Sequence, residues 1–456
     1  MVQRIERGLD GLIDHYTVAC LVLAQFIMTL IGIGDVRTVS LAGLVLCLVG
    51  LARPSARADF WILVPLILYS LIGMGSTYAV CGNIVDGYGT LHLIFPVLYL
   101  LIACLKREER LLLKRACAAW AGVVAAIGIG QFVFRAAVQG QGGRLGGLLG
   151  NPNAMGIFLV VGWFALMACL PEKEERGLAA VLPCLEPVLL IALALTLSMG
   201  SFLAMAVGIL VLLAGKKSGN SWQETACWAC RLLGRVTLGV GTGVLIYLAA
   251  VRTDLPWICV PLLAYGAAET ALWRKLGRFM EAYPWVAALA TAMGAAVALM
   301  IVVMRPSSVA TFEERLEMMV SASRYLLTNP LLGVGPYQWR MLDLYDGGAY
   351  FNTWHIHNVL IHVGVEMGLA AMASLAVVAV RVCQKRREPA VKAGFTAFCV
   401  HNLMDTGFFY LGVTSLALIS AADPQGRELS GWRLKAFFVF FAALFVISLF
   451  SLTGAV

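Results

Sequence analysis

Long apolar runs recur along the whole chain, and they restrict its fold more than any other feature. Most are close to the roughly 20 residues that an α-helix needs to cross a bilayer. Hydrophobic residues make up 60% of the sequence and charged residues only 13%, a balance that does not suit a water-soluble protein. The sequence therefore predicts an all-α, polytopic integral membrane protein with about 14 transmembrane helices. The expected spans are 16–34, 37–52, 60–78, 89–105, 116–134, 153–171, 179–198, 201–215, 236–251, 256–273, 286–304, 357–380, 394–422 and 435–453.

The positions of lysine and arginine predict how the chain crosses the membrane. These residues gather in alternate loops, and cytoplasmic loops are the ones enriched in positive charge. We therefore expect a multi-pass protein with a cytoplasmic N-terminus, and the family resemblance described below implies that its membrane is the cytoplasmic (inner) one. The net charge of +8 then reflects this topology and not binding to nucleic acid. The outward segments would be 79–88, 135–152, 252–255 and the long segment from 305 to 354.

Three regions follow from this topology. Residues 1–304 would form the N-terminal transmembrane helices, residues 305–356 an outward, extracytoplasmic loop, and residues 357–456 the C-terminal transmembrane helices. The segment 394–422 fits either one long tilted helix or two short helices that meet near residues 405–407.

The outward loop is too long to be a simple connector. Residues 311–327 have the pattern of an amphipathic helix, which Asn329 and Pro330 would end before a glycine-rich turn at 333–336. We expect this helix to lie on the outer membrane surface. On the inner side, the basic stretch 106–115 is typical of an interfacial anchor.

Histidines stand at the outer edge of the span that begins near residue 357. His357 and its neighbour His355 carry side chains that exchange protons near neutral pH, so either could take a proton from a hydroxyl group. Asn358 follows directly, and this group could instead serve to cap the helix. Trp354 is typical of the membrane interface and could also stack on a sugar ring.

Two further pairs of ionisable residues have the i, i+4 spacing of a helix. His362 and Glu366 form one pair, for which a structural hydrogen bond is the simpler interpretation. His401 and Asp405 form the other, and they could equally fix a bend before Gly407. Ionisable groups at membrane depth are candidates for function in either case.

Two arginines fall in the outward segments and could bind an anion. Arg315 lies in the expected amphipathic helix, and Arg144 lies in a glycine-rich loop that runs into a helix. Asn151 or Asn153 could cap that helix, and Pro152 suits its first turn. A helix N-terminus beside a guanidinium group is suited to phosphate. Each arginine could instead be a surface side chain that reaches toward water.

No metal and no cofactor are expected. The outward histidines have no carboxylate cluster beside them in the sequence. Most of the cysteines lie inside apolar runs, where they behave as small hydrophobic residues. Cys227 and Cys230 form a single CxxC motif without a second pair, which is weak evidence for a metal site.

Residues 144–422 contain several patches that resemble the O-antigen ligase and O-antigen polymerase family of bacterial envelope glycosyltransferases. The patches are Arg315 with the later stretch Pro330-Leu-Leu-Gly-Val-Gly-Pro336; His357-Asn358 with Leu360 and Glu366-x-Gly368-Leu369; Arg144 with Gly150-Asn151-Pro152-Asn153; and the late element His401-Asn402-Leu403-Met404-Asp405.

The resemblance implies a metal-independent, inverting transfer of a glycan from undecaprenyl pyrophosphate to an acceptor at the outer face of the cytoplasmic membrane. Arg315 and His357 would be the catalytic residues, with Arg315 on the pyrophosphate and His357 on the acceptor hydroxyl. The substrate-binding residues would be Arg144, His355, Asn358, Trp354 and Glu366.

Some features depart from the family pattern. A basic residue is expected after the serine near 198–201, but the sequence there is Ser198-Met199-Gly200-Ser201. Met319 stands where an aromatic residue is common, and about two extra spans near 236–273 precede the outward loop. A polymerase of the same family therefore stays open beside a ligase. The sequence is also compatible with a proton-coupled transporter that uses His362, Glu366, His401 and Asp405, or with a non-catalytic scaffold.

Overall fold

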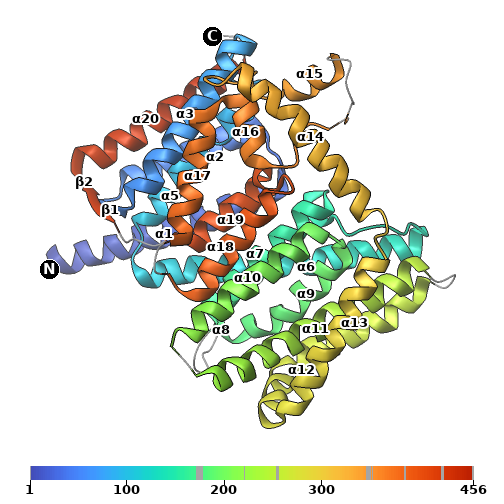
Figure 1. The fold of residues 1–456 in the computed structure, drawn as a ribbon. Helices are drawn as coiled ribbons and strands as arrows, with labels where there is room; N and C mark the ends of the chain where they lie inside the picture. The colour runs from blue at the N-terminus through green and yellow to red at the C-terminus, as the bar shows by residue number, and fades with distance from the viewer. Residues whose placement is uncertain are drawn as a thin grey trace. The chain divides into compact units, whose positions relative to one another are not determined.

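The chain is almost wholly helical in the computed structural model (Figure 1). The structure describes residues 2–170, 178–219, 221–252, 256–345, 351, 353–384, 387–422 and 426–453. Within these ranges, 7 helices are long and apolar enough to cross a membrane. The prediction of a helical, multi-pass membrane protein agrees with this finding, while the full number of spans and their orientation stay predictions.

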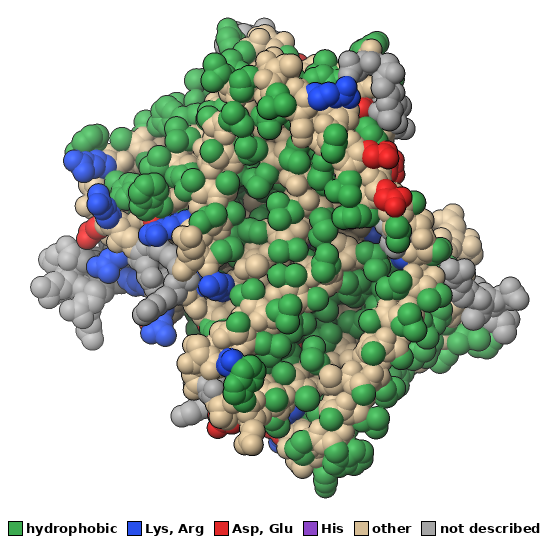
Figure 2. Space-filling model, viewed as in Figure 1, with side chains coloured by type: hydrophobic (Ala, Val, Ile, Leu, Met, Phe, Trp, Pro, Cys, Tyr) green, Lys and Arg blue, Asp and Glu red, His purple; other side chains and the backbone are tan. Residues whose placement is uncertain are grey.

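Hydrophobic side chains cover much of the surface in Figure 2. Many large apolar residues are exposed along the candidate spans, among them Leu68, Leu210, Leu289 and Leu299. Such a surface is unfavourable in water and matches the hydrocarbon of a bilayer.

The chain divides into two compact units, and the first is discontinuous in sequence. Unit 1 comprises Met1–Leu113, Phe312–Arg386 and Asn402–Val456. Its elements are α1 (Val2–Leu30), α2 (Val36–Leu51), β1 (Ser55–Ala58), α3 (Phe60–Cys81), α4 (Tyr88–Leu91), α5 (Ile94–Ala103), α14 (Ser308–Thr328, mostly in this unit), α15 (Trp339–Tyr345), α16 (Val359–Met367), α17 (Leu369–Gln384), the 3₁₀ turn η4 (Gly407–Phe409), α19 (Leu411–Ala421), β2 (Arg427–Ser430) and α20 (Gly431–Ser451).

Helices from the two ends of the sequence pack together in unit 1. α2 packs along α20, α1 along α19, and α3 along α17 (Figure 1). β1 and β2 form an antiparallel ribbon in which Ser55 faces Ser430 and Ala58 faces Arg427. The hydropathy pattern did not predict this ribbon, because each strand has only 4 residues.

Unit 2 comprises Lys114–Thr311 and Arg387–His401. Within it, α11 packs against α9 and α13, and α7 packs against α9 and α10. Its elements are α6 (Arg107–Gln139, mostly in this unit), η1 (Gly147–Leu149), α7 (Pro152–Cys169), α8 (Leu178–Val181), η2 (Leu182–Cys184), α9 (Leu185–Thr196), α10 (Met199–Lys217), α11 (Trp222–Arg252), η3 (Pro256–Ile258), α12 (Cys259–Ala282), α13 (Pro284–Val303) and α18 (Pro389–Asn402, which ends in unit 1).

Several expected boundaries agree with the structure, because their end signals are local. Asn151 caps α7 by accepting hydrogen bonds from the N–H groups of Asn153 and Ala154, and Pro152 occupies the first turn. α14 ends at Thr328, directly before Asn329 and Pro330. The segment 394–422 is two helices, α18 and α19, separated by residues 403–410.

The basic stretch at 106–115 is continuous with the span that follows it, since α6 runs without a break from Arg107 to Gln139. Its role as an interfacial anchor stays a prediction. One expectation about continuity was wrong. The expected span 357–380 is two helices, α16 and α17, which separate at Gly368. Gly368 has a φ angle of +85°, and a Cβ there would lie 2.1 Å from the carbonyl oxygen of Leu331. The tight approach of the 330–335 turn therefore breaks the helix.

Gly368→Ala should lower the thermal unfolding temperature of the purified protein, measured in detergent. A backbone with positive φ and ψ of 173°, a region essentially confined to glycine, costs a non-glycine residue about 1–3 kcal/mol, and the collision with Leu331 adds to this cost. Gly75→Ala is the matched control in unit 1, because its Cβ would meet nothing within 4 Å. Equal unfolding temperatures for the two variants would show that the break at Gly368 is not required.

Candidate functional site

Three separate segments of unit 1 bring an arginine, a histidine and an aspartate together. Nη2 of Arg315, on α14, lies 3.1 Å from Oδ2 of Asp405, which is in the loop after α18. The other carboxylate oxygen of Asp405 lies 3.6 Å from Nδ1 of His357, just before α16. One carboxylate thus stands between a permanent cation and a titratable ring, and both of these side chains keep some exposure.

The loop that carries Asp405 is held in place by its backbone. Arg315 donates through Nη1 to the carbonyl oxygen of Met404 at 2.6 Å. Asn358 donates through Nδ2 to the carbonyl oxygen of Leu403 at 3.1 Å. The N–H of Thr406 donates to Oδ1 of Asp405 at 2.8 Å. Consecutive residues of this loop are therefore fixed from both α14 and the start of α16.

Asn358 has a structural role as well as a place in the cluster. Its side chain caps α16, because Oδ1 accepts a hydrogen bond from the N–H of Ile361 at 3.1 Å. With Nδ2 on Leu403, both ends of the amide have partners within the protein. Asn358 therefore ties α16 to the Asp405 loop, which sets the distance between His357 and Asp405.

An apolar cluster holds α14 against α15 and α16. Its buried members are Met318, Ala322, Trp339, Ile356 and Val365. On α14, residues 315, 318 and 322 have the i, i+3, i+7 spacing that places them on one face of a helix. The packing that buries this face also directs Arg315 toward the His357 segment.

Glu366 is fully buried and fixes the turn at 337–339. Its Oε2 accepts the N–H of Tyr337 at 3.0 Å, and its Oε1 accepts the N–H of Trp339 at 3.1 Å. Tyr337 has a φ angle of +65°, a strained value that these hydrogen bonds help to hold. The geometry therefore favours a positioning role for Glu366 over contact with a substrate.

His362 connects Glu366 to the histidine segment, which is the segment before α16 that carries His355 and His357. Its Nδ1 accepts a hydrogen bond from the N–H of Ile356 at 3.3 Å, so the ring proton must be on Nε2. Nε2 lies 3.1 Å from Oε2 of Glu366. Ile356 stands between His355 and His357, so the buried pair of His362 and Glu366 anchors the backbone that carries both histidines.

The side chain of His355 is buried, although His355 belongs to the histidine segment. Its ring lies 4.4 Å from the ring of Phe409 and 5.0 Å from that of His362, measured between centroids. Its Nε2 has no hydrogen-bond partner among the described residues. Burial lowers the pKa of His355 well below its usual value, and the neighbouring imidazoles lower it further. His355 is therefore a neutral ring at neutral pH.

Trp354 lies on the exposed side of the same segment. Its side chain is 52% exposed, and the guanidinium of Arg340 stands 4.4 Å from the centre of its ring. Tyr337 meets it edge to face at 6.2 Å. This arrangement presents an aromatic surface next to a cation, which suits a sugar or a phosphate-bearing ligand.

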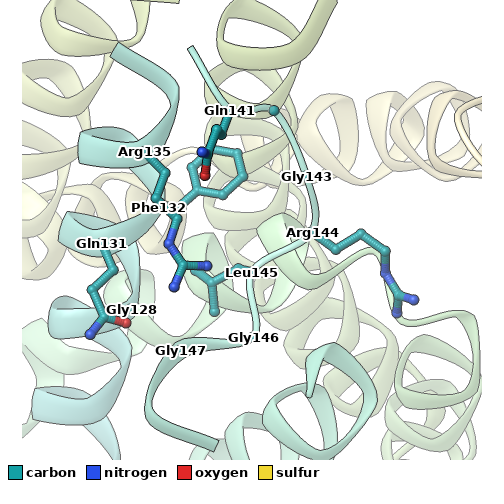
Figure 3. A pocket seen from close by; sticks show the side chains of 11 residues that line it. Gly128, Gln131, Phe132, Arg135, Gln141, Gly143, Arg144, Leu145, Gly146 and Gly147 are labelled. Atoms are coloured by element: carbon teal, nitrogen blue, oxygen red, sulfur yellow. The ribbon is translucent and has the colours of Figure 1, made fainter. Parts of the chain in front are cut away.

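Arg144 belongs to unit 2 and is held inside that unit. It donates through Nε to the carbonyl oxygen of Thr196 at 2.7 Å and through Nη2 to Oδ1 of Asn153 at 2.6 Å. The glycine-rich loop around it lines a pocket with Gln131 and Arg135 of α6. In Figure 3 the Arg135 side chain points toward Leu145 in this pocket, whereas the Arg144 side chain points away from it.

The structure thus brings together several residues that the sequence singled out: Arg315, His355, His357, Asn358, Trp354 and Glu366 all lie in unit 1. Asp405 was not among the expected site residues, although the late element that contains it was noticed. α18 ends at Asn402, so Asp405 lies beyond the helix, and the two residues of the expected pair, His401 and Asp405, do not share one helical turn.

Within the described ranges, no group of three or more His, Cys, Asp and Glu side chains is arranged to hold a metal ion. A scan against protein-family models finds no match, and a search of curated proteins finds no similar chain.

Glu366→Gln should lower the unfolding temperature. A glutamine offers a single acceptor oxygen, so one buried N–H of the 337–339 turn would lose its partner, at a cost of about 1–3 kcal/mol. Glu313→Gln is the matched control, since Glu313 is exposed on α14. If both variants unfold at the wild-type temperature in detergent, the carboxylate does not hold the turn.

His355 should make the fold less stable in acid. The unfolded chain takes up a proton on this ring near pH 6.5, while the folded chain excludes it, so stability is full above that pH and falls as the pH drops. The slope contributed is up to about 1.4 kcal/mol per pH unit. His355→Phe keeps an aromatic ring beside Phe409 and should flatten the fall in unfolding temperature between pH 7 and pH 5. Parallel curves for the two proteins would contradict this assignment.

Proposed function

We propose that this chain is an O-antigen ligase-like glycosyltransferase that moves a glycan from undecaprenyl pyrophosphate to an acceptor at the outer face of the cytoplasmic membrane. The observation that carries the proposal is the grouping of Arg315, His357 and Asp405 in unit 1. These three residues come from the three C-terminal patches on which the family resemblance rests. The transfer is inverting and needs no metal.

The chemistry requires a base for the acceptor hydroxyl. The acceptor oxygen attacks the anomeric carbon as the bond from that carbon to pyrophosphate breaks, and the hydroxyl proton goes to the base. Nδ1 of His357 faces Asp405, which leaves Nε2 to receive this proton. The Asp405 carboxylate then stabilises the positive charge on the ring, as an aspartate does beside the histidine of a hydrolase triad.

The leaving pyrophosphate gathers negative charge, and Arg315 is suited to hold it. A guanidinium has five N–H donors, and two of its nitrogens, Nη1 and Nη2, contact Met404 and Asp405. Each of these two nitrogens carries a second N–H, and the side chain keeps some exposure. Donors are therefore left for phosphate oxygens while the arginine keeps its position.

Other residues would bind the substrate or position this centre. Trp354 offers an exposed aromatic face for a sugar. Asn358 and Glu366 hold the backbone around His357, and His355 packs against Phe409 next to it. For Arg144, in unit 2, a phosphate contact is implied by the family resemblance alone.

The acceptor decides between a ligase and a polymerase of the same family. A ligase would accept a lipid core or a wall polymer, and a polymerase would accept another lipid-linked repeat. A proton-coupled transporter is the weaker candidate, because both carboxylate oxygens of Glu366 already accept backbone N–H groups. A proton relay through Glu366 would have to break these hydrogen bonds.

Transfer in proteoliposomes tests the proposal. The wild type should move an undecaprenyl-pyrophosphate-linked oligosaccharide without added metal. His357→Ala should lose about 10²–10⁴-fold in rate, since it removes the general base. Arg315→Ala should lose about 10²–10³-fold, since it removes a donor to the developing charge. Gel sizing then separates the two activities: a ladder from donor alone means a polymerase, and a single shift that needs a second acceptor means a ligase.

Arg324→Ala is the matched control for this assay. Arg324 lies on the same helix as Arg315 but is exposed, and its guanidinium donates to Ser321 of its own helix. The rate of this variant should equal that of the wild type. Full transfer by well-expressed His357→Ala and Arg315→Ala proteins would overturn the proposed function.

A further inference from the structure

A small basic pocket lies within unit 2, between the first half of α11 and the end of α12. It has a volume of about 80 Å³, several times the space that one water molecule requires. It is lined by Trp228, Arg231, Leu232 and Arg235 of α11 and by Gly277, Met280 and Glu281 of α12. Neither the proposed transfer reaction nor the resemblance assigns a role to these residues.

The two arginines of the pocket are held in different ways. Nε of Arg235 lies 3.6 Å from Oε1 of the buried Glu186, and that nitrogen makes no hydrogen bond in the described part of the chain. Glu186 also accepts the indole N–H groups of Trp163 and Trp273 at 3.4 and 2.8 Å. The carboxylate of Glu186, which two tryptophans also hold in place, therefore restrains the position of Arg235.

Arg231 is held more loosely. It pairs with Glu281 at 3.5 Å, and the Glu281 side chain is 62% exposed. An exposed ion pair of this kind is worth little, about 0–1 kcal/mol. An anion that can take two or more hydrogen bonds from Arg231 and Arg235 would therefore displace Glu281 from Arg231 at a small cost.

More positive charge surrounds the pocket. The Nζ atom of Lys216, at the end of α10, stands 5.5 Å from the ring centre of Trp228, which forms one wall. Arg274, Lys275 and Arg278 are exposed on the last turns of α12. Together these groups attract an anion and repel a cation.

The same end of these helices has the side chains of a membrane–water interface. Trp222 precedes the pocket on α11, Phe279 lies among the pocket residues of α12, Tyr283 follows the end of α12, and Trp285 is in the first turn of α13. All four side chains are about half exposed or more. Lys217 lies over the ring of Trp222 at 3.3 Å. Exposed aromatic residues beside lysines are typical of the headgroup level of a bilayer. The basic pocket therefore opens where phospholipid phosphates would be.

We propose that this pocket binds the phosphate group of an anionic phospholipid, with Arg231 and Arg235 as its direct ligands. Basic pockets between helices on the positively charged side of membrane proteins are suited to such headgroups. Phosphate is a bidentate partner for guanidinium, and the exposed apolar surface next to the pocket would take the acyl chains. This inference does not depend on the proposed transfer reaction.

Lipid retention measured by native mass spectrometry on the full chain tests this proposal. The wild type should keep one phosphatidylglycerol or cardiolipin molecule at least about tenfold more tightly than phosphatidylcholine, which corresponds to about 1.4 kcal/mol. Arg231→Gln should remove most of this preference. Glu281→Gln should strengthen it, because the competing carboxylate is gone.

Gly277→Leu separates occupation of the pocket from loss of charge. A Cβ at Gly277 would meet nothing within 4 Å, so a leucine there fills the pocket without straining α12. This variant should lose the bound lipid while its unfolding temperature in lipid-free detergent stays at or above that of the wild type. Lys275→Gln is the charge control, because Lys275 is exposed near the pocket but does not line it. Its retention should change less than about twofold, since an exposed charge outside the pocket adds only a weak, salt-screened attraction.

Three results would overturn the proposal. Equal retention of phosphatidylglycerol and phosphatidylcholine would show that the pocket does not select an anionic headgroup. Unchanged retention in Gly277→Leu would place the lipid elsewhere. Inorganic phosphate that protects Arg231 from a guanidinium-directed reagent, in a protein that retains no lipid, would assign the pocket to a soluble phosphate instead.

Discussion

The candidate site depends on one buried carboxylate. Glu366 accepts the N–H groups of Tyr337 and Trp339 and faces Nε2 of His362, and none of its surface is in contact with water. A buried charge of this kind is tolerated only where donors surround it. Because its partners come from the turn before α15 and from α16, the carboxylate determines where the segment with His355 and His357 can lie. The hydroxyl of Ser76 on α3 adds to this restraint by donating to the carbonyl oxygens of Leu332 and Glu366.

Much of this arrangement follows from local sequence signals. The apolar runs predicted helices of membrane length, and Asn151 with Pro152 marked the start of α7. The alternation of charged and apolar residues after residue 311 predicted α14, and Asn329-Pro330 marked its end. These features are decided within one turn of a helix, so the sequence is enough to read them.

Features that depend on distant segments could not be read in this way. Gly368 breaks the expected span because the carbonyl oxygen of Leu331 approaches it, and no local pattern records that approach. Asp405 was interpreted as half of a helical pair with His401, whereas its carboxylate contacts Arg315, which is 90 positions earlier in the numbering. The spacing along the helix predicted that Glu366 pairs with His362, and the resemblance implied that it binds substrate. Neither prediction included its two backbone partners, because they lie 27 and 29 residues away.

Unit 1 is built from segments near both ends of the sequence, and this arrangement sets the order in which the unit can form during synthesis. Its first segment ends at Leu113, yet its β1 strand pairs with β2 and its α2 packs on α20, both of which belong to the last thirty residues. During synthesis, all of 114–311 must therefore enter the membrane while the first segment still lacks its partners. The carboxylate of Asp405 joins Arg315 and His357 only after most of the chain has left the ribosome. A nascent chain thus has an incomplete candidate site until Asp405 has been made, and the early helices need shielding by lipid or by an insertion factor during that time.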